Sequence, residues 1–323
     1  MGIALNLAYL ISRTLKTTEN SNKKILTIGV QDCYFDSNKL LTLFNKKNIP
    51  HKNIESEDIE LTTGFRHLSE EGRKNFLKNI HQRTFFEYLG FARKNITSLD
   101  VSNYECCDIE HDLNYPISEE LHNRYDVVFD SGSIEHIISI KDVFFNMAKM
   151  LKIGGLVIQF APVDMINHGF INLNACIFND FYTLNGFERV DLRYIGIPFS
   201  DEDSHFLEID PFIIREPLRA PYSLAVFSAY IKLENKNLKV PIQSFYHELL
   251  NGEISSEIVT LDSLSESAFN DKDEGKLVFF PQWVKTKFSS FCHNKSRDPK
   301  GEAKRGGIFD DAVHIPHLKV DLI

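Results

Sequence analysis

The segment YDVVFDSGSIEH, residues 125–136, decides the fold, because a short apolar run in it gives way to an acid, a glycine and a Glu-His pair. An apolar run that stops at turn residues is typical of a parallel strand covered on both faces. In open α/β sheets, ligands bind beyond the carboxyl ends of such strands. The segment therefore predicts a strand over 125–130 that delivers polar residues to a ligand site.

Composition limits the class of protein. A chain of 323 residues can form one large α/β domain with an extension, or two domains. The formal net charge of -9 argues against nucleic acid as a partner, because phosphate recognition needs a concentrated cationic surface. Five cysteines without CxxC spacing favour a reducing compartment, and the apolar stretch 3–11 is too short to span a bilayer. We therefore expect a cytoplasmic protein without membrane insertion.

Strand and helix patterns alternate along the rest of the chain. Apolar runs predict further strands at 24–29, 95–100, 104–109, 156–162, 189–195 and 224–233. Helical spacing predicts helices at 141–151, which Gly154-Gly155 would cap, and at 177–182, which Asn185-Gly186 would stop. This alternation predicts a doubly wound, mostly parallel α/β sheet.

The domain organisation follows from where these patterns weaken. Residues 36–94 are longer than one crossover helix needs, so we expect a helical insertion there that covers a site. The strand and helix pattern ends near residue 235, which predicts a domain over 1–235 and an extension over 236–323. Within that extension, the charged and Gly-containing segment 296–307 has the composition of a mobile segment.

Polar residues follow the predicted strands. Asp100 ends the second strand, where an acid can accept hydrogen bonds from both hydroxyls of an adenosine ribose, although a helix N-cap is the alternative. Asp112 follows the third strand and can receive an adenine amino group. Gly29 and Gln31 form the first turn, where a glycine lets the backbone approach a ligand. The chain lacks GxGxxG and GxxxxGK[ST], which favours a ligand with an adenosine but without phosphates.

The order of these features resembles class I S-adenosylmethionine-dependent methyltransferases over about residues 20–235. The resemblance rests on strand-Gly29, strand-Asp100, Asp112-Leu113-Asn114, the segment 125–136 and helix-Gly154-Gly155-strand. It implies a seven-stranded Rossmann-like sheet and S-adenosylmethionine as the cofactor. The implied cofactor-binding residues are Gly29, Gln31, Asp100, Asp112, Asp130 and Gly132. The first motif departs from the family in keeping one glycine, and the spacing from Gly29 to Asp100 is longer than usual.

Candidate catalytic residues follow the fourth and fifth strands. His168 is the candidate general base, because an imidazole can take the proton from an attacking hydroxyl or amine, and a loop histidine bonded to backbone is the alternative. Glu135 is the functional candidate of the Glu-His pair, since His136 fits a capping or packing role among isoleucines. The group Asp108, Glu110, His111 and Asp112 would need further ligands to form a metal site, so we expect no metal.

The sequence therefore predicts an S-adenosylmethionine-dependent methyltransferase acting on a small-molecule or carbohydrate-like acceptor. The alternative is a catalytically inactive, methyltransferase-like binding or scaffold protein that has lost the cofactor with its first motif. A nucleotide-sugar oxidoreductase would share the acid of the second strand, but it would need a glycine-rich pyrophosphate turn and a Tyr-x-x-x-Lys pair in the right place.

Overall fold

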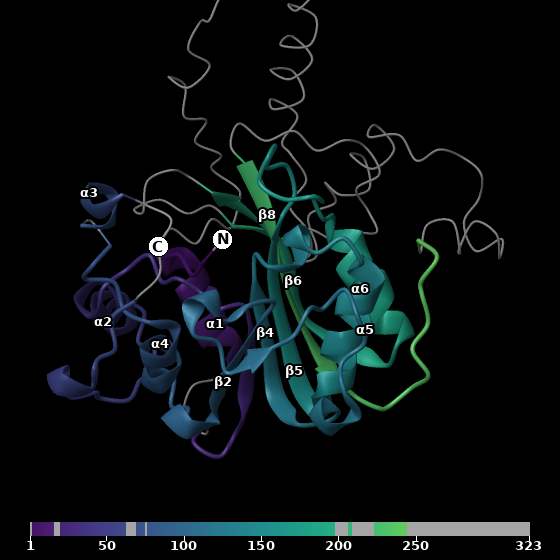
Figure 1. Ribbon diagram of the computed structural model, residues 1–323, viewed down its shortest axis with the longest axis horizontal. Helices are drawn as coiled ribbons and strands as arrows, with labels where there is room; N and C mark the ends of the chain where they lie inside the picture. Colours follow the sequence, from purple (N-terminus) through teal and green to yellow (C-terminus); the bar gives the residue numbers. More distant parts are fainter. Residues whose placement is uncertain are drawn as a thin grey trace, which may run out of the picture.

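The computed structural model describes residues 2–15, 20–62, 69–74, 76–197, 206–208 and 223–243. These residues form a central sheet with helices on both of its faces (Figure 1). The α-helices are α1 (Leu5–Leu15), α2 (Ser37–Lys46), α3 (Glu70–Arg73), α4 (Gln82–Tyr88), α5 (Ile140–Met150) and α6 (Ala175–Leu184). Every helix in this described part of the chain is too short or too polar to traverse a lipid bilayer.

The strands form one mixed sheet in the order β3-β2-β1-β4-β5-β8-β6-β7. They are β1 (Ile25–Ile28), β2 (Ile96–Asp100), β3 (Ile109–Glu110), β4 (Tyr125–Ser131), β5 (Leu151–Pro162), β6 (Phe187–Ile197), β7 (Phe206–Glu208) and β8 (Ser223–Lys232). Strands β1 to β5 pair in parallel, whereas β8 is antiparallel to both β5 and β6. Apart from the short edge strand β7, this is the seven-stranded order of the class I methyltransferase fold, so the predicted fold is confirmed.

Two apolar cores hold the helices to the sheet. One lies between the sheet and α1, α2 and α4, and the other between the sheet and α5 and α6 (Figure 1). In the first core the ring of Phe86 from α4 meets the ring of Phe129 from β4 edge-on, with centroids 5.5 Å apart. Burying an aromatic side chain of this size contributes about 1.5–3 kcal/mol. The predicted insertion 36–94 thus contributes much of one covering layer.

Two predictions about local structure are wrong. The third strand is Ile109–Glu110 and not 104–109, because the preceding residues form the 3-10 helix η3 (Asn103–Glu105), in which Tyr104 is exposed. Gly154-Gly155 does not cap α5. That helix ends at Met150, and both glycines lie inside β5, where the pairing with β4 shifts register between Tyr125 and Val127. The positive φ of Gly154 fits this bulge.

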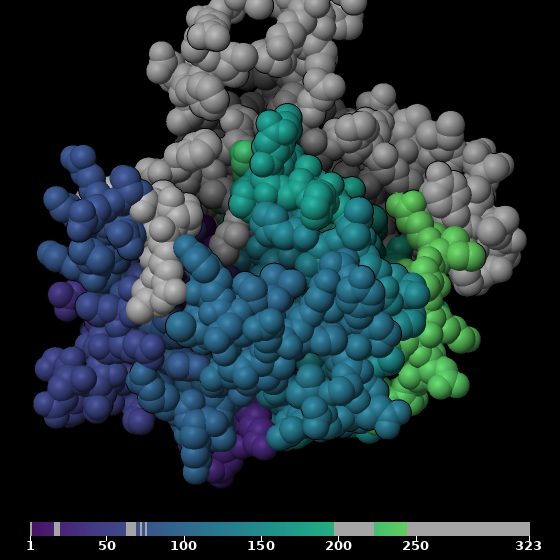
Figure 2. Space-filling view, in the orientation of Figure 1, coloured from purple at the N-terminus to yellow at the C-terminus, as the bar shows by residue number. Residues whose placement is uncertain are grey.

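The first residues of the expected extension pack against the domain. Asn185, which caps α6, donates from Nδ2 to the Lys239 carbonyl at 2.9 Å and accepts from the Lys239 N–H at 2.7 Å. The green segment in Figure 2 runs along the outside of the molecule as far as residue 243. Residues 244–323, including the segment 296–307, lie outside the described part of the chain.

Candidate functional site

The carboxyl ends of β1 and β2 bring Gly29 and Asp100 together. The parallel register pairs Ile28 with Leu99, and the Gly29 N–H donates to the Leu99 carbonyl at 2.7 Å. Gly29 has φ +77°, and a Cβ built there would lie 3.8 Å from Asp100 Oδ2 and 2.8 Å from Ser133 Oγ. A side chain at this position would therefore collide with Ser133 and strain the turn, so the position requires glycine.

Gln31 lies in the turn after β1 and connects it to neighbouring elements. Its N–H donates to Gln82 Oε1 at 2.8 Å, which ties the turn to the start of α4. Its side-chain Nε2 donates to the Ile28 carbonyl and, at 3.2 Å, to Ser133 Oγ. Gln31 Oε1 is buried and accepts no hydrogen bond from a described residue. This oxygen is thus an acceptor that a donor on a ligand can satisfy.

Asp112 sits at the end of β3, beside the Asp100 strand. Its Oδ1 accepts from the N–H of Asn114 at 2.9 Å and from the Asn114 amide at 2.8 Å, which makes a compact turn. The N–H of His111 donates to the Asp100 carbonyl at 2.8 Å, so the two strand ends remain adjacent. Asp112 therefore lies on the same edge of the sheet as Gly29 and Asp100.

Asp130 and Gly132 shape the loop after β4. Asp130 is fully buried, and its Oδ1 accepts from the Ser133 N–H at 3.0 Å, whereas its Oδ2 accepts no hydrogen bond from a described residue. Burial, with the nearby charge of Glu135, raises the pKa of Asp130 to about 8. Gly132 has φ +87°, which lets the chain turn sharply here. Asp130 therefore fixes the loop after β4 through this hydrogen bond, and its side chain is not exposed to a ligand.

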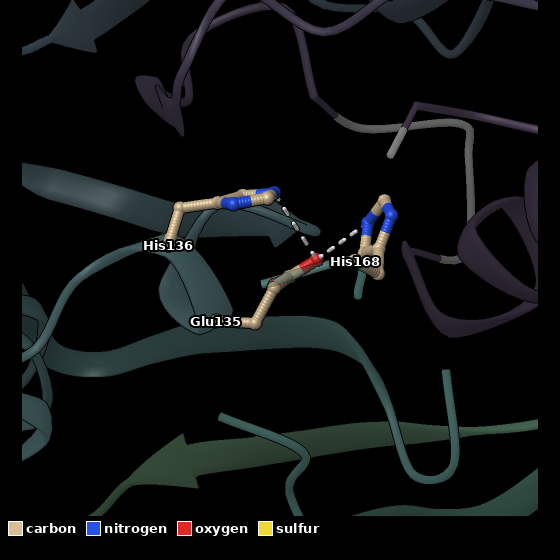
Figure 3. Close-up of side chains that lie close together, drawn as sticks. All are labelled: Glu135, His136 and His168. Atoms are coloured by element: carbon tan, nitrogen blue, oxygen red, sulfur yellow. Dashed lines mark ion pairs between the residues drawn. The ribbon is translucent and has the colours of Figure 1, made fainter. Parts of the chain in front are cut away.

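Glu135 and His168 meet at the mouth of the sheet. Glu135 lies in the 3-10 helix η5 (Ile134–His136), and His168 lies in the loop after β5. The His168 Nε2 atom is 3.3 Å from Glu135 Oε1, and the Glu135 side chain is fully buried (Figure 3). Burial raises the pKa of Glu135 to about 7 and lowers the pKa of His168 below its ordinary value. The two residues predicted to be catalytic are thus in contact.

The loop after β5 is fixed onto Glu135 by its backbone. The N–H of Phe170 donates to the Glu135 carbonyl at 2.8 Å, and the N–H of Ile171 donates to the same oxygen at 3.3 Å. A Cβ at Gly169 would lie 2.7 Å from that carbonyl oxygen and 2.8 Å from the Glu135 Cγ atom. Only glycine allows this close approach, which places His168 next to the carboxylate.

The expected place of His136 at the start of a helix is wrong. Helix α5 begins at Ile140, so His136 belongs to η5 and not to the helix start, and its side chain is 47% exposed. Its Nε2 atom is 3.9 Å from Glu135 Oε1, and its ring meets the His168 ring at a centroid distance of 5.2 Å (Figure 3). The Glu-His pair in the sequence carried this signal, but the second histidine is 32 positions away.

The predicted residues fit an adenosine-containing cofactor. Asp100 supplies a partly exposed carboxylate at a strand end, and Gln31 supplies an unsatisfied buried acceptor one turn away. Both lie around the positive-φ turn at Gly29, as S-adenosylmethionine would require at its ribose and methionine ends. Asp108, in contrast, accepts hydrogen bonds from Arg83 Nη2 at 2.7 Å and from the Ser98 N–H at 2.8 Å. It therefore links α4 to β2 and has a structural role.

Comparisons with known proteins find likeness at low identity only. No protein-family model matches the chain, and no curated protein matches its sequence. Similar solved structures include the branched-chain polyamine synthase of Thermus thermophilus in complex with N4-aminopropylspermidine and 5'-methylthioadenosine, with 13% identity over 74% of this chain and 57% of that chain and a TM-score of 0.34. Another is a suggested methyltransferase of Bacillus halodurans, with 12% identity over 71% of this chain and 99% of that chain and a TM-score of 0.33.

The trans-methyltransferase CalH in complex with SAH is a third, with 13% identity over 71% of this chain and 55% of that chain and a TM-score of 0.32. The chain thus spans little more than half the length of several structures that it matches. At these values the likeness carries no argument about this chain, and the fold rests on its own strand order. The strand order, with its antiparallel β8 between β5 and β6, gives the chain the α/β fold of class I methyltransferases.

Proposed function

We propose that the protein is an S-adenosylmethionine-dependent methyltransferase that acts on a small-molecule or carbohydrate-like acceptor. The observation that carries this proposal is the juxtaposition of Asp100 with the positive-φ turn at Gly29, at the carboxyl edge of a methyltransferase-type sheet. In nucleotide-binding sheets, a carboxylate in this place accepts hydrogen bonds from the ribose hydroxyls. The absence of a phosphate-binding glycine motif in the sequence favours the same ligand.

The cofactor-binding residues have distinct roles in this proposal. Asp100 holds the ribose, and Asp112 with its neighbouring backbone faces the adenine. Gly29 allows close approach of the methionine part, and Gln31 Oε1 accepts a hydrogen bond from its ammonium group. Gly132 and Asp130 hold the β4 loop in place. When bound, the cofactor supplies an electrophilic sulfonium methyl group, and the protein contributes chiefly alignment.

His168 and Glu135 stand on the acceptor side of this proposal. The neutral imidazole of His168 takes the proton from an acceptor hydroxyl or amine at Nδ1, while its buried Nε2 atom faces Glu135 Oε1 at 3.3 Å. The buried carboxylate of Glu135 orients the ring and stabilises the imidazolium that forms. Base catalysis of this kind contributes about 10²- to 10⁴-fold, so a variant without it retains some activity.

The position of the insertion 36–94 favours a small acceptor molecule. The segment before α4 pairs with the first turn through an antiparallel bridge between Asp32 and His81, and Thr62 donates to Asp32 Oδ1 at 2.9 Å. The insertion therefore lies beside the turn after β1, where it can bound one side of the acceptor site. An acceptor site bounded in this way suits a small acceptor more than a long polymer.

Thermal unfolding with and without ligands tests the cofactor. S-adenosylmethionine and its demethylated product should both raise the melting temperature, because a ligand that binds only the folded state stabilises it. ATP and NAD should not, since the first turn has no phosphate cradle. Stabilisation by ATP but not by S-adenosylmethionine would overturn the proposal.

The inactive scaffold is favoured by one observation. The Gln31 side chain is almost fully buried and bonded to both Ile28 and Ser133, so it narrows the single-glycine turn where the methionine part of a cofactor would lie. If this side chain excludes the cofactor, neither S-adenosylmethionine nor its product shifts the melting temperature. A variant Gln31→Ala that gains such a shift would then assign the loss to this side chain.

A further inference from the structure

The cluster of Glu135, His136 and His168 is the only group of three metal-capable side chains in the described part of the chain. Its three ligand atoms all lie within 4.8 Å of one another. In Figure 3 both imidazoles point toward the same carboxylate, one from η5 and the other from the loop after β5. Two chain segments more than 30 residues apart thus converge on one point in space.

The carboxylate of Glu135, at the centre of this cluster, receives no hydrogen bond from the described residues. Glu135 is fully buried, and neither of its oxygens accepts a hydrogen bond from a described residue. The His168 Nε2 atom is also buried without a hydrogen bond to a described residue. Leaving such groups unsatisfied in the interior costs several kcal/mol in general. A cation bound between these atoms would satisfy the carboxylate and the imidazole lone pair together.

The donor set selects the class of cation. Two imidazole nitrogens and one carboxylate oxygen suit divalent first-row transition metals, whereas Ca²⁺ and Mg²⁺ prefer sites made of oxygen atoms. In a tetrahedral zinc site with bonds of about 2.0–2.1 Å, neighbouring ligand atoms are about 3.3–3.4 Å apart. The His168–Glu135 separation of 3.3 Å already has this value, and the His136 separation of 3.9 Å needs only a small ring movement.

The exposure of the ligands indicates an open coordination position. Glu135 closes the inner side of the cluster, while the His136 and His168 side chains are 47% and 31% exposed. Three protein ligands with a free position toward solvent are typical of catalytic zinc sites, whereas structural sites use four protein ligands. An oxygen atom of an acceptor could occupy this position.

We propose that Glu135, His136 and His168 form a binding site for one divalent transition-metal ion of the Zn²⁺ type. Binding of the ion does not depend on the proposed methyltransferase function, but its use does. With the ion bound at Nε2, the His168 imidazole keeps its proton at Nδ1 and is no longer a base. An acceptor hydroxyl bound to the ion then loses its proton more readily, because a bound cation lowers the pKa of the coordinated oxygen.

Calorimetric titration of Zn²⁺ into the chelator-treated full chain tests this site. We expect one equivalent to bind, and we expect His136→Ala and His168→Ala each to weaken binding at least tenfold. Because nearly half of the His136 side chain is exposed, its variant should retain the wild-type melting temperature. His51→Ala is the matched control, since this histidine contacts the Ile49 carbonyl, away from the cluster, and should bind Zn²⁺ as the wild type does.

A spectroscopic measurement gives an independent readout. Co²⁺ added in place of Zn²⁺ should show visible absorption bands of a low-coordinate site in the wild type and in His51→Ala, and these bands should be lost in Glu135→Gln. The metal proposal is overturned if the wild type binds no stoichiometric Zn²⁺, or if His136→Ala and His168→Ala bind it unchanged. Titration of S-adenosylmethionine into the same chelated protein tests the proposed function separately, so failure of one is distinguishable from failure of the other.

Discussion

The His168 imidazole lies 3.3 Å from the carboxylate of Glu135, although 33 residues separate the two in sequence. Backbone hydrogen bonds from the 170–171 segment to the Glu135 carbonyl fix this relationship, and the close approach of Gly169 allows it. The acceptor side of the proposed site is therefore built by one loop folding back onto η5. Its chemistry depends on a buried carboxylate that no described hydrogen-bond donor satisfies.

Glu135→Gln should stabilise the chelated protein. The substitution removes a buried negative charge, and the new amide can donate to the lone pair on His168 Nε2. We expect the free energy of unfolding at pH 8 to rise by about 1–3 kcal/mol in urea denaturation. Added Zn²⁺ should reverse the order, since only the wild type gains binding free energy.

Glu119→Gln is the control for that measurement, because Glu119 is exposed. Its stability should stay within about 0.5 kcal/mol of the wild type. A large loss of stability in Glu135→Gln without metal would show that the carboxylate is well satisfied in solution, contrary to the structure.

Asp130→Asn should flatten the dependence of stability on pH. The folded carboxyl has a pKa of about 8, whereas an aspartate in the unfolded chain has a pKa of about 3.9. Between these values the folded state holds a proton that the unfolded state has released, so the free energy of unfolding falls as pH rises from about 4 to 8. The slope from one such group approaches about 1.4 kcal/mol per pH unit.

Urea unfolding of both proteins at pH 5, 6, 7 and 8 checks this prediction. The asparagine keeps the acceptor for the Ser133 N–H, so the loop should stay in place. The difference in stability between the variant and the wild type should grow in favour of the variant as pH rises. Parallel curves would mean that Asp130 is already ionised at pH 5 in the folded state.

Lys232→Met should destabilise the fold without touching the site. Lys232 is buried, and its Nζ atom donates to the carbonyls of Ala148 at 2.7 Å and Leu151 at 2.8 Å, at the end of α5. The methionine fills the same space but leaves these carbonyls unsatisfied, which should cost about 1–3 kcal/mol in chemical denaturation. Lys236→Met, at an exposed lysine paired with Glu234, should change stability by less than about 0.5 kcal/mol. Equal effects of the two variants would contradict the role of Lys232 in satisfying the carbonyls at the end of α5.

The sequence patterns predicted most of the sheet because its central strands are buried on both faces. The runs at β1, β2, β4 and β5 are apolar for this reason; the predicted ranges agree with β1, β2 and β4 to within one residue at each end, whereas the prediction for β5 omits 151–155. β3 was misplaced because it has only two residues, neither of them fully buried. Gly154-Gly155 was misread because a glycine pair after a helix marks a C-cap and a strand bulge equally well.

The site could be predicted only in part. The strand ends that carry Gly29, Asp100 and Asp112 follow from the order of the strands, so their shared edge was predictable. The contact between Glu135 and His168 was not predictable, because it depends on how an irregular loop folds back. The proximity of His136 to His168 is not predictable either, because the spacing of the neighbouring isoleucines indicates a packed helix start, whereas the structure forms a 3-10 turn there.

The central claim is that Asp100 and the Gly29 turn bind S-adenosylmethionine, and calorimetric titration of the cofactor into the wild type and Asp100→Ala tests it most directly. The wild type should bind one equivalent, and Asp100→Ala should bind about 10- to 100-fold more weakly, as expected for lost charge-assisted hydrogen bonds to the ribose. Glu110→Gln, an exposed acid that pairs with Asp100 across the strands, should bind as the wild type does. Absence of binding by the wild type, or equal binding by Asp100→Ala, would contradict the claim.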